Sequence, residues 1–132
     1  SFGSALMYFV VPKIILFREE HTPRTLVKKV DFVSAPGISP PNVYRPGGPK
    51  YLITNKALFS FNKKDKNFKI EKINPEFTLD EVVKSTGFEF KINNNLKYFT
   101  MPSQKRMDIL RNLIAPKVLN FYPQFAKKLW FN

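Results

Sequence analysis

The stretch spanning residues 47–73 constrains the fold of this chain most, because it predicts three consecutive β-strands. A Gly-Gly-Pro sequence leads into two segments, 50–55 and 57–62, that are rich in aromatic and β-branched residues, and such residues favour strands. After a polar turn, residues 68–73 alternate between apolar and charged side chains, as a half-exposed strand does. We therefore expect an antiparallel hairpin over residues 57–73.

Three further segments are predicted to be strands. Residues 13–17 form a short continuous apolar run, which is typical of a strand buried on both faces. Residues 28–37 place several apolar side chains on one face, and residues 88–92 alternate in the same way. We expect the three consecutive asparagines at 93–95 to form a turn after the last of these strands.

Two segments carry helix signals, and together with the strands they define the fold class. Thr78 and Glu81 fit a T-x-x-E capping box, and we expect Gly87 to end this helix in the left-handed conformation. Residues 103–115 have apolar side chains on one helical face and should end at Pro116. This mixture predicts an α/β fold, an open, mostly parallel sheet with an antiparallel hairpin at its margin.

The 132 residues are predicted to form a single domain, residues 1–132, in which the aromatic and basic segment 116–132 is a docking tail. The 14 phenylalanines argue against disorder, and the absence of cysteine excludes disulfides and thiolate metal sites. The long apolar run at 5–17 is broken by Pro12 and Lys13 and is shorter than the roughly 20 residues of a membrane helix. We expect no membrane segment and a cytoplasmic protein.

The formal net charge of +12 bears on partners rather than on fold. Nucleic-acid binding, an acidic protein partner and a lysine-rich surface without a specific partner are three alternatives. Lysines interleaved with aromatic residues can bind single-stranded nucleic acid, but no RNA-binding signature is present. Since the alternating aromatics are explained as the core face of the hairpin, a protein partner is favoured over nucleic acid.

Gly47, Gly48 and Pro49 are the candidate binding residues. A double glycine lets backbone amides approach a substrate carbonyl or a phosphate closely. The alternative is that the glycines form a turn required between Pro46 and Pro49.

Glu20 and His21 are adjacent, and a carboxylate beside an imidazole is a pattern of acid–base chemistry. Adjacent loop residues point in different directions, however, and no third group can be identified, so we expect a structural or surface role for both. His21 is the only histidine, and without cysteine a transition-metal site is not expected. No catalytic residue is predicted in this chain.

Three segments stand in an order that resembles a known family. They read EEHTPRTLVKKVDFVSAPG at 19–37, GGPKYLITNKALFSF at 47–61 and INPEFTLDEVVKSTGFEF at 73–90. In this order they resemble the C-terminal half of the β subunit of family I coenzyme A transferases, the group that contains glutaconate and 3-oxoacid CoA-transferases. The resemblance is strongest over residues 13–115.

The resemblance implies a partial domain of a CoA-transferase-like α/β fold and the transfer of CoA between an acyl-CoA and a carboxylate. It implies acyl-CoA as a substrate, bound near Gly47, Gly48 and Pro49, and no further cofactor. In the family a glutamate attacks the acyl-CoA and forms a glutamyl-CoA thioester, which divides one difficult step into two easier ones. The sequence contains neither the glutamate motif nor the family's glycine-rich turn, and Asn55 replaces the usual aspartate.

The resemblance therefore implies a hetero-oligomer in which a partner subunit supplies the glutamate, and we expect this chain to be inactive alone. Its positive charge would complement an acidic partner subunit or the phosphates of CoA. Two alternatives are a non-catalytic interaction or regulatory subunit that has kept the fold, and a nucleic-acid-binding module driven by charge.

Overall fold

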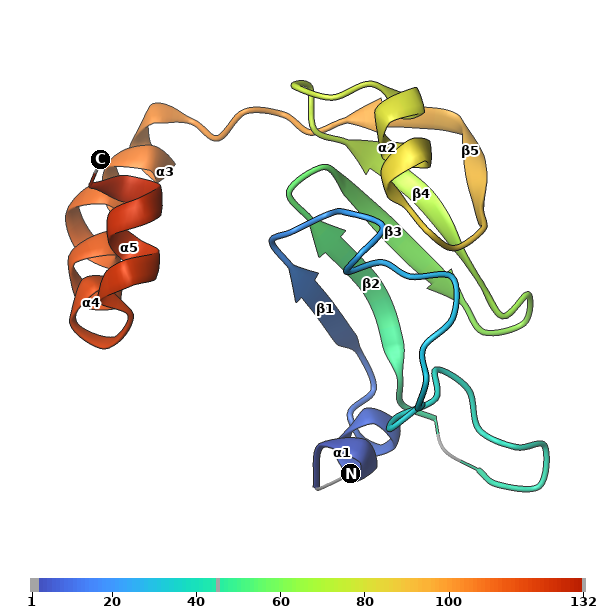
Figure 1. Cartoon of the computed structure of the whole chain (residues 1–132). Helices are drawn as coiled ribbons and strands as arrows, with labels where there is room; N and C mark the ends of the chain where they lie inside the picture. Colours follow the sequence, from blue (N-terminus) through green and yellow to red (C-terminus); the bar gives the residue numbers. More distant parts are fainter. Residues whose placement is uncertain (1–2, 45, 132) are drawn as a thin grey trace. The chain divides into compact units, whose positions relative to one another are not determined.

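The computed structural model of the chain describes residues 3–44 and 46–131 (Figure 1). The chain divides into two compact units, Ser1–Phe99 and Thr100–Asn132. The prediction of one domain over 1–132, with a docking tail at 116–132, stays a prediction.

The first unit is built on a five-stranded sheet in the order β1-β2-β3-β4-β5. Its strands are β1 (Ile14–Arg18), β2 (Pro49–Thr54), β3 (Ala57–Asn62), β4 (Asn67–Ile73) and β5 (Phe90–Tyr98). The β1–β2 and β4–β5 pairs are parallel, and the β2–β3 and β3–β4 pairs are antiparallel. This confirms the α/β class and the hairpin over residues 57–73.

Two details of the predicted sheet are corrected. Parallel and antiparallel pairs are equal in number, so the sheet is mixed rather than mostly parallel. The hairpin β3–β4 lies at the centre of the sheet and not at its margin, because each of its strands also pairs with an outer neighbour, β2 on one side and β5 on the other.

Three local predictions about strands are wrong. Strand β1 is not buried on both faces, because it lies at the edge of the sheet and leaves Ile15 and Phe17 65% and 68% exposed. Residues 28–37 form no strand, since no neighbouring segment pairs with them, and Phe32 is 75% exposed. The asparagines at 93–95 lie inside β5 instead of forming a turn, because pairing with β4 resumes beyond them.

The core of the first unit lies on one face of the sheet. There α2 (Leu79–Ser85) and the long connection between β1 and β2 pack against the strands (Figure 1). Phe59 of β3, Ile70 of β4 and Val82 of α2 are fully buried, and burying a side chain of this size stabilises the fold by about 1.5–3 kcal/mol. The ring of Phe59 meets three other rings edge-on, those of Phe68, Phe88 and Phe90.

The capping box of α2 is confirmed. The Thr78 hydroxyl accepts a hydrogen bond from the Glu81 amide at 3.3 Å, and the Thr78 amide donates to the Glu81 carboxylate at 2.7 Å. The prediction for Gly87 is wrong, because Gly87 is not among the positive-φ residues of the described chain. Instead, its amide donates to the carbonyl oxygen of Leu26 at 2.6 Å, and a Cβ would lie 2.4 Å from that oxygen.

Helices account for the remaining elements. α1 (Gly3–Val10) precedes β1, and the second unit contains α3 (Gln104–Ile109), a π-helical turn (Leu110–Ile114), α4 (Ala115–Phe121) and α5 (Pro123–Trp130). The helix predicted from 103 does not stop at Pro116, because this proline lies in the first turn of α4, where its missing N–H is tolerated. Among the described residues, no helix has the length and apolar character needed to span a membrane.

Candidate functional site

The segment at Gly47, Gly48 and Pro49 is buried at the start of β2. Gly48 has a φ of +134°, a conformation that favours glycine. Its amide donates to the carbonyl of Val11 at 3.3 Å, and its carbonyl accepts from the amide of Ile14 at 3.2 Å. These contacts explain the glycine as part of a tight turn, and the binding role of the three residues stays a prediction.

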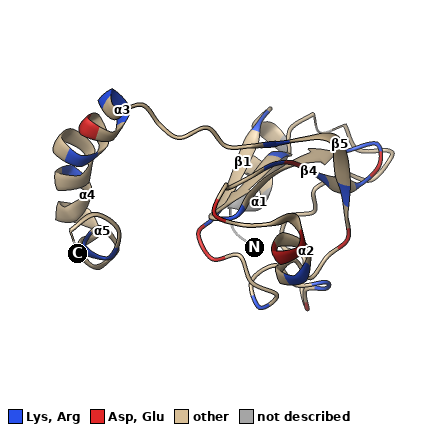
Figure 2. Cartoon of the chain, turned by 90° about the horizontal axis from the view of Figure 1, so that it is seen from above, with Lys and Arg blue, Asp and Glu red and all other residues tan. Residues whose placement is uncertain are grey.

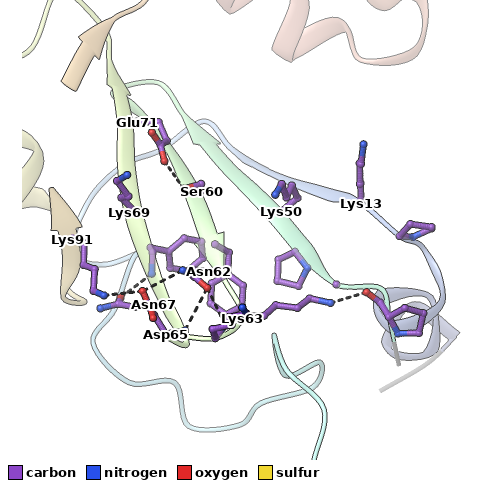
Figure 3. Close-up of a pocket in the computed structure, with 17 residues that line it drawn as sticks. Lys13, Lys50, Ser60, Asn62, Lys63, Asp65, Asn67, Lys69, Glu71 and Lys91 are labelled. Atoms are coloured by element: carbon purple, nitrogen blue, oxygen red, sulfur yellow. Dashed lines mark hydrogen bonds and ion pairs between the residues drawn. The ribbon is translucent and has the colours of Figure 1, made fainter. Parts of the chain in front are cut away.

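A hollow of about 700 Å³ opens beside this segment (Figure 3). The turn between β3 and β4 closes one end, because the ammonium of Lys63 donates to the carbonyl of Pro46 at 2.7 Å and also to that of Gly47. Of the predicted binding residues, Gly48 and Pro49 line the hollow, while Gly47 only accepts the bond from Lys63. We call this feature, with the residues that line it, the lysine hollow.

The lysine hollow is strongly basic, as is the whole chain, which has 22 Lys and Arg against 10 Asp and Glu (Figure 2). Two carboxylates, Asp65 and Glu71, face six lysines there. Lys91 is paired with Asp65 at 2.7 Å, and Lys63 binds carbonyls. The other four form no ion pair with any residue that the structure describes; they are Lys13, Lys50, Lys64 and Lys69.

Both carboxylates of the hollow already have partners. Glu71 lies at a register shift of β4, where an extra residue redirects side chains. One of its oxygens accepts from the Ser60 hydroxyl at 2.7 Å, and the other accepts from the Asn93 amide at 2.5 Å. Asp65 accepts from Asn62 at 3.1 Å in addition to its ion pair. Neither acid is therefore free to neutralise the remaining lysines.

His21 lies elsewhere, in a buried polar group that we call the His21 cluster, made of His21, Thr54 and Thr86. Its side chain is 1% exposed, with Nδ1 2.8 Å from the Thr54 hydroxyl and Nε2 2.8 Å from the Thr86 hydroxyl. Burial, with a smaller contribution from the charge of Lys56, lowers the pKa of His21 to about 4. The imidazole is thus neutral at pH 7 and joins β2, the end of α2 and the β1–β2 connection.

Glu20 points away from His21, as expected for neighbouring loop residues. Its carboxylate binds Arg24 at 2.9 Å and lies 3.6 Å from Arg18. Hydrogen bonds from Arg24 and Thr22 lower the pKa of Glu20. The pair therefore forms no acid–base couple, and His21 has the expected structural role. In the two described ranges, no three side chains of the metal-binding types gather to hold a metal ion.

Sequence reasoning found the lysines of the hairpin but missed how lysines from other strands join them. Lys69 and Lys91 are partners in the parallel β4–β5 pair, and Lys50 lies where the β1–β2 register shifts. These neighbours are set by strand order, which no local pattern indicates. Thr54 and Thr86 were missed for the same reason, since they meet only at His21.

The fold is that of the CoA-transferases. Glutaconate CoA-transferase from Acidaminococcus fermentans matches with a TM-score of 0.74 and 22% identity over 88% of this chain and 46% of that chain. IpdAB from Rhodococcus jostii RHA1 matches with a TM-score of 0.70 and 26% identity, over 81% and 45%. The decarboxylase AibA/AibB has a TM-score of 0.63 and 19% identity, over 83% and 41%. No protein-family model matches the chain.

The particular protein that the sequence resembles is one of the subunits of glutaconate CoA-transferase from Acidaminococcus fermentans. The two are 26% identical over 104 residues, which cover 74% of this chain and 39% of that protein. This confirms the resemblance to a family I CoA-transferase β subunit. The chain thus spans less than half the length of the relatives it matches.

Proposed function

We propose that this chain is one part of a CoA-transferase and moves CoA between an acyl-CoA and a carboxylate only together with a partner chain. The observation that carries the proposal is the 26% identity to a glutaconate CoA-transferase subunit, combined with a match to only 39% of its length. The family resemblance assigns the nucleophile to a glutamate motif that these 132 residues lack. A covalent mechanism without its nucleophile cannot proceed, so another polypeptide must supply it.

The exposed face of the sheet supports a protein partner. Ile15 and Phe17 of β1 are exposed, and their register partners Tyr51 and Ile53 of β2 are half-buried. Exposed apolar patches mark interaction sites, and the outer edge of β1 offers backbone groups that another strand can pair with. The occupant we propose is a chain equivalent to the part of the CoA-transferase subunit outside the match, which is more than half of it.

The structural neighbours support an assembly but do not fix the reaction. AibA/AibB is named as a pair of components and is a decarboxylase, so this fold supports more than one chemistry. CoA transfer is favoured here because the sequence relative is itself a CoA-transferase subunit. The net charge of +12 favours an acidic partner, whose association should weaken as salt screens the charges.

The experiment that tests the proposal is isolation of the tagged chain from its own cells at low and high salt, with identification of the proteins that accompany it. The identified partner and this chain are then purified separately and combined, and CoA transfer is assayed from acetyl-CoA to glutaconate and other carboxylates. We expect no turnover from either chain alone and turnover from the complex, with a CoA thioester on a glutamate of the partner.

Two results would change this conclusion. Turnover by the isolated 132-residue chain would contradict the need for a partner. A stable complex that binds no acyl-CoA and shows no turnover would favour the non-catalytic interaction subunit instead.

A further inference from the structure

The lysine hollow has the size of a small-molecule site. Its volume of about 700 Å³ falls within the roughly 300–1,000 Å³ of ordinary ligand pockets. It is bounded by rigid elements, with strands β2 to β5 along its walls and the Lys63 contacts holding the segment before β2 in place. A single strand of nucleic acid needs a basic groove that extends along its backbone, whereas this hollow is closed at the Lys63 end.

The charges of the hollow lie on two opposite sides of it. Lys13 and Lys50 come from the β1–β2 side, and Lys69 comes from the β4 side (Figure 3). An ammonium group is a compact charge with three donors and binds phosphate well. Since Asp65 and Glu71 are already occupied, nothing in the described walls balances these lysines.

We propose that the lysine hollow binds the phosphate groups of a small ligand that carries at least two of them, as in a nucleotide diphosphate. A single monovalent anion would leave most of the positive charge unbalanced, whereas two linked phosphates can contact lysines on both sides at once. This inference does not require the proposed function, because it concerns the hollow of the isolated chain and not CoA transfer. If the proposed function is correct, CoA is the natural source of the phosphates.

The test is calorimetric titration of the full 132-residue chain with three probes, inorganic pyrophosphate, ADP and CoA, at about 20 mM and 200 mM salt. We expect binding of all three at low salt and weaker binding at high salt. The double variant Lys50→Gln/Lys69→Gln should lose at least about tenfold in affinity, since charge-assisted hydrogen bonds are removed. The matched control Lys28→Gln/Lys29→Gln removes the same charge from the β1–β2 connection and should change affinity less than about twofold.

Each outcome has a defined meaning. CoA binding at least about tenfold tighter than pyrophosphate would support the site with CoA as its ligand, and equal affinities would support it with a free phosphate compound. The proposal is overturned if none of the probes binds at low salt, or if both double variants lose affinity equally. It is also overturned if an oligo-glutamate peptide binds the same lysines more tightly than all three probes, which would identify an acidic protein as the partner.

A second measurement locates the site without any substitution. Backbone amide shifts in NMR spectra of the wild-type chain should change on pyrophosphate addition at Gly48, Lys50 and Lys69. Changes confined to the second unit would contradict the proposal. Because neither measurement depends on catalysis, failure here leaves the proposed function standing, and failure to transfer CoA leaves this site standing.

Discussion

The His21 cluster and the lysine hollow treat polar groups in opposite ways within one unit. In the cluster, a 1% exposed imidazole has a partner for both ring nitrogens, at 2.8 Å each. In the hollow, four ammonium groups have no carboxylate partner among the described residues. Buried polar groups must be paired to avoid a large cost, while exposed charges can stay solvated until a ligand arrives. The first region therefore holds the fold together, and the second is available for binding.

The largest expected effect comes from removing the centre of the cluster. His21→Ala deletes a buried ring, which lies 6.0 Å from the ring of Phe59, and leaves the Thr54 and Thr86 hydroxyls without it. We expect the free energy of unfolding to fall by about 4 kcal/mol, from the cavity and the lost hydrogen bonds. Urea unfolding followed by circular dichroism measures it, and Lys69→Gln in the hollow should stay within about 0.5 kcal/mol. A loss below about 1 kcal/mol for His21→Ala would remove the contrast between the two regions.

Protonation of His21 should give the next largest effect. Its pKa of about 4 in the folded chain lies below the ordinary value of 6.5, so the unfolded state binds a proton more readily. The corresponding stability is fully present above pH 6.5 and is lost as the pH falls from 6.5 towards 4, by up to about 3 kcal/mol. Unfolding measured at half-unit pH steps checks this.

The matched control for the pH experiment is His21→Gln, which retains a polar side chain without a titrating ring. Its stability should be lower at pH 7 but flat between pH 6.5 and 5. A wild-type slope that persists unchanged in His21→Gln would assign the pH dependence to other groups.

The contact between Gly87 and Leu26 tests how firmly the cluster is held. Gly87→Ala would place a Cβ 2.4 Å from the Leu26 carbonyl oxygen, which forces backbone next to Thr86 to move. We expect a loss of about 2 kcal/mol, measured by thermal unfolding. Gly37→Ala is the control, because its Cβ would meet a phenylalanine ring at 3.1 Å rather than backbone, and it should cost less. Equal losses would mean that the tight approach to Leu26 has no special weight.

Sequence reasoning succeeded where structure is set by neighbours along the chain. The hairpin over 57–73 and the capping box of Thr78 and Glu81 depend on alternation and on contacts three residues apart, and both are present. The family order of segments also predicted the fold class correctly.

Sequence reasoning failed where structure depends on distant partners. Residues 28–37 have strand-like composition but meet no strand to pair with, and Gly87 is explained by Leu26, which is 61 positions earlier in the chain. The lysine hollow depends on the same kind of information, because Lys69 and Lys91 become neighbours only through the parallel β4–β5 pair. Charge was visible in the composition, but its concentration around one hollow was not.

The smallest expected effect is also the one with the opposite sign. Lysines gathered around the hollow repel one another, so Lys50→Gln/Lys69→Gln should raise the free energy of unfolding of the free chain, by about 0.5 kcal/mol at about 10 mM ionic strength. At about 0.5 M salt the difference should vanish, because the screening length is then only a few ångströms. Chemical unfolding in urea, which is uncharged, is the suitable measurement.

Pyrophosphate should reverse the order of the two proteins. A ligand that binds only the folded state stabilises it in proportion to the logarithm of its concentration over Kd, so wild type should gain stability and Lys50→Gln/Lys69→Gln should gain much less. The His21→Gln variant, whose hollow is intact, should gain as much as wild type. A double variant that is less stable than wild type without ligand would instead give these lysines a structural role like that of His21, and the contrast between the two regions would fail.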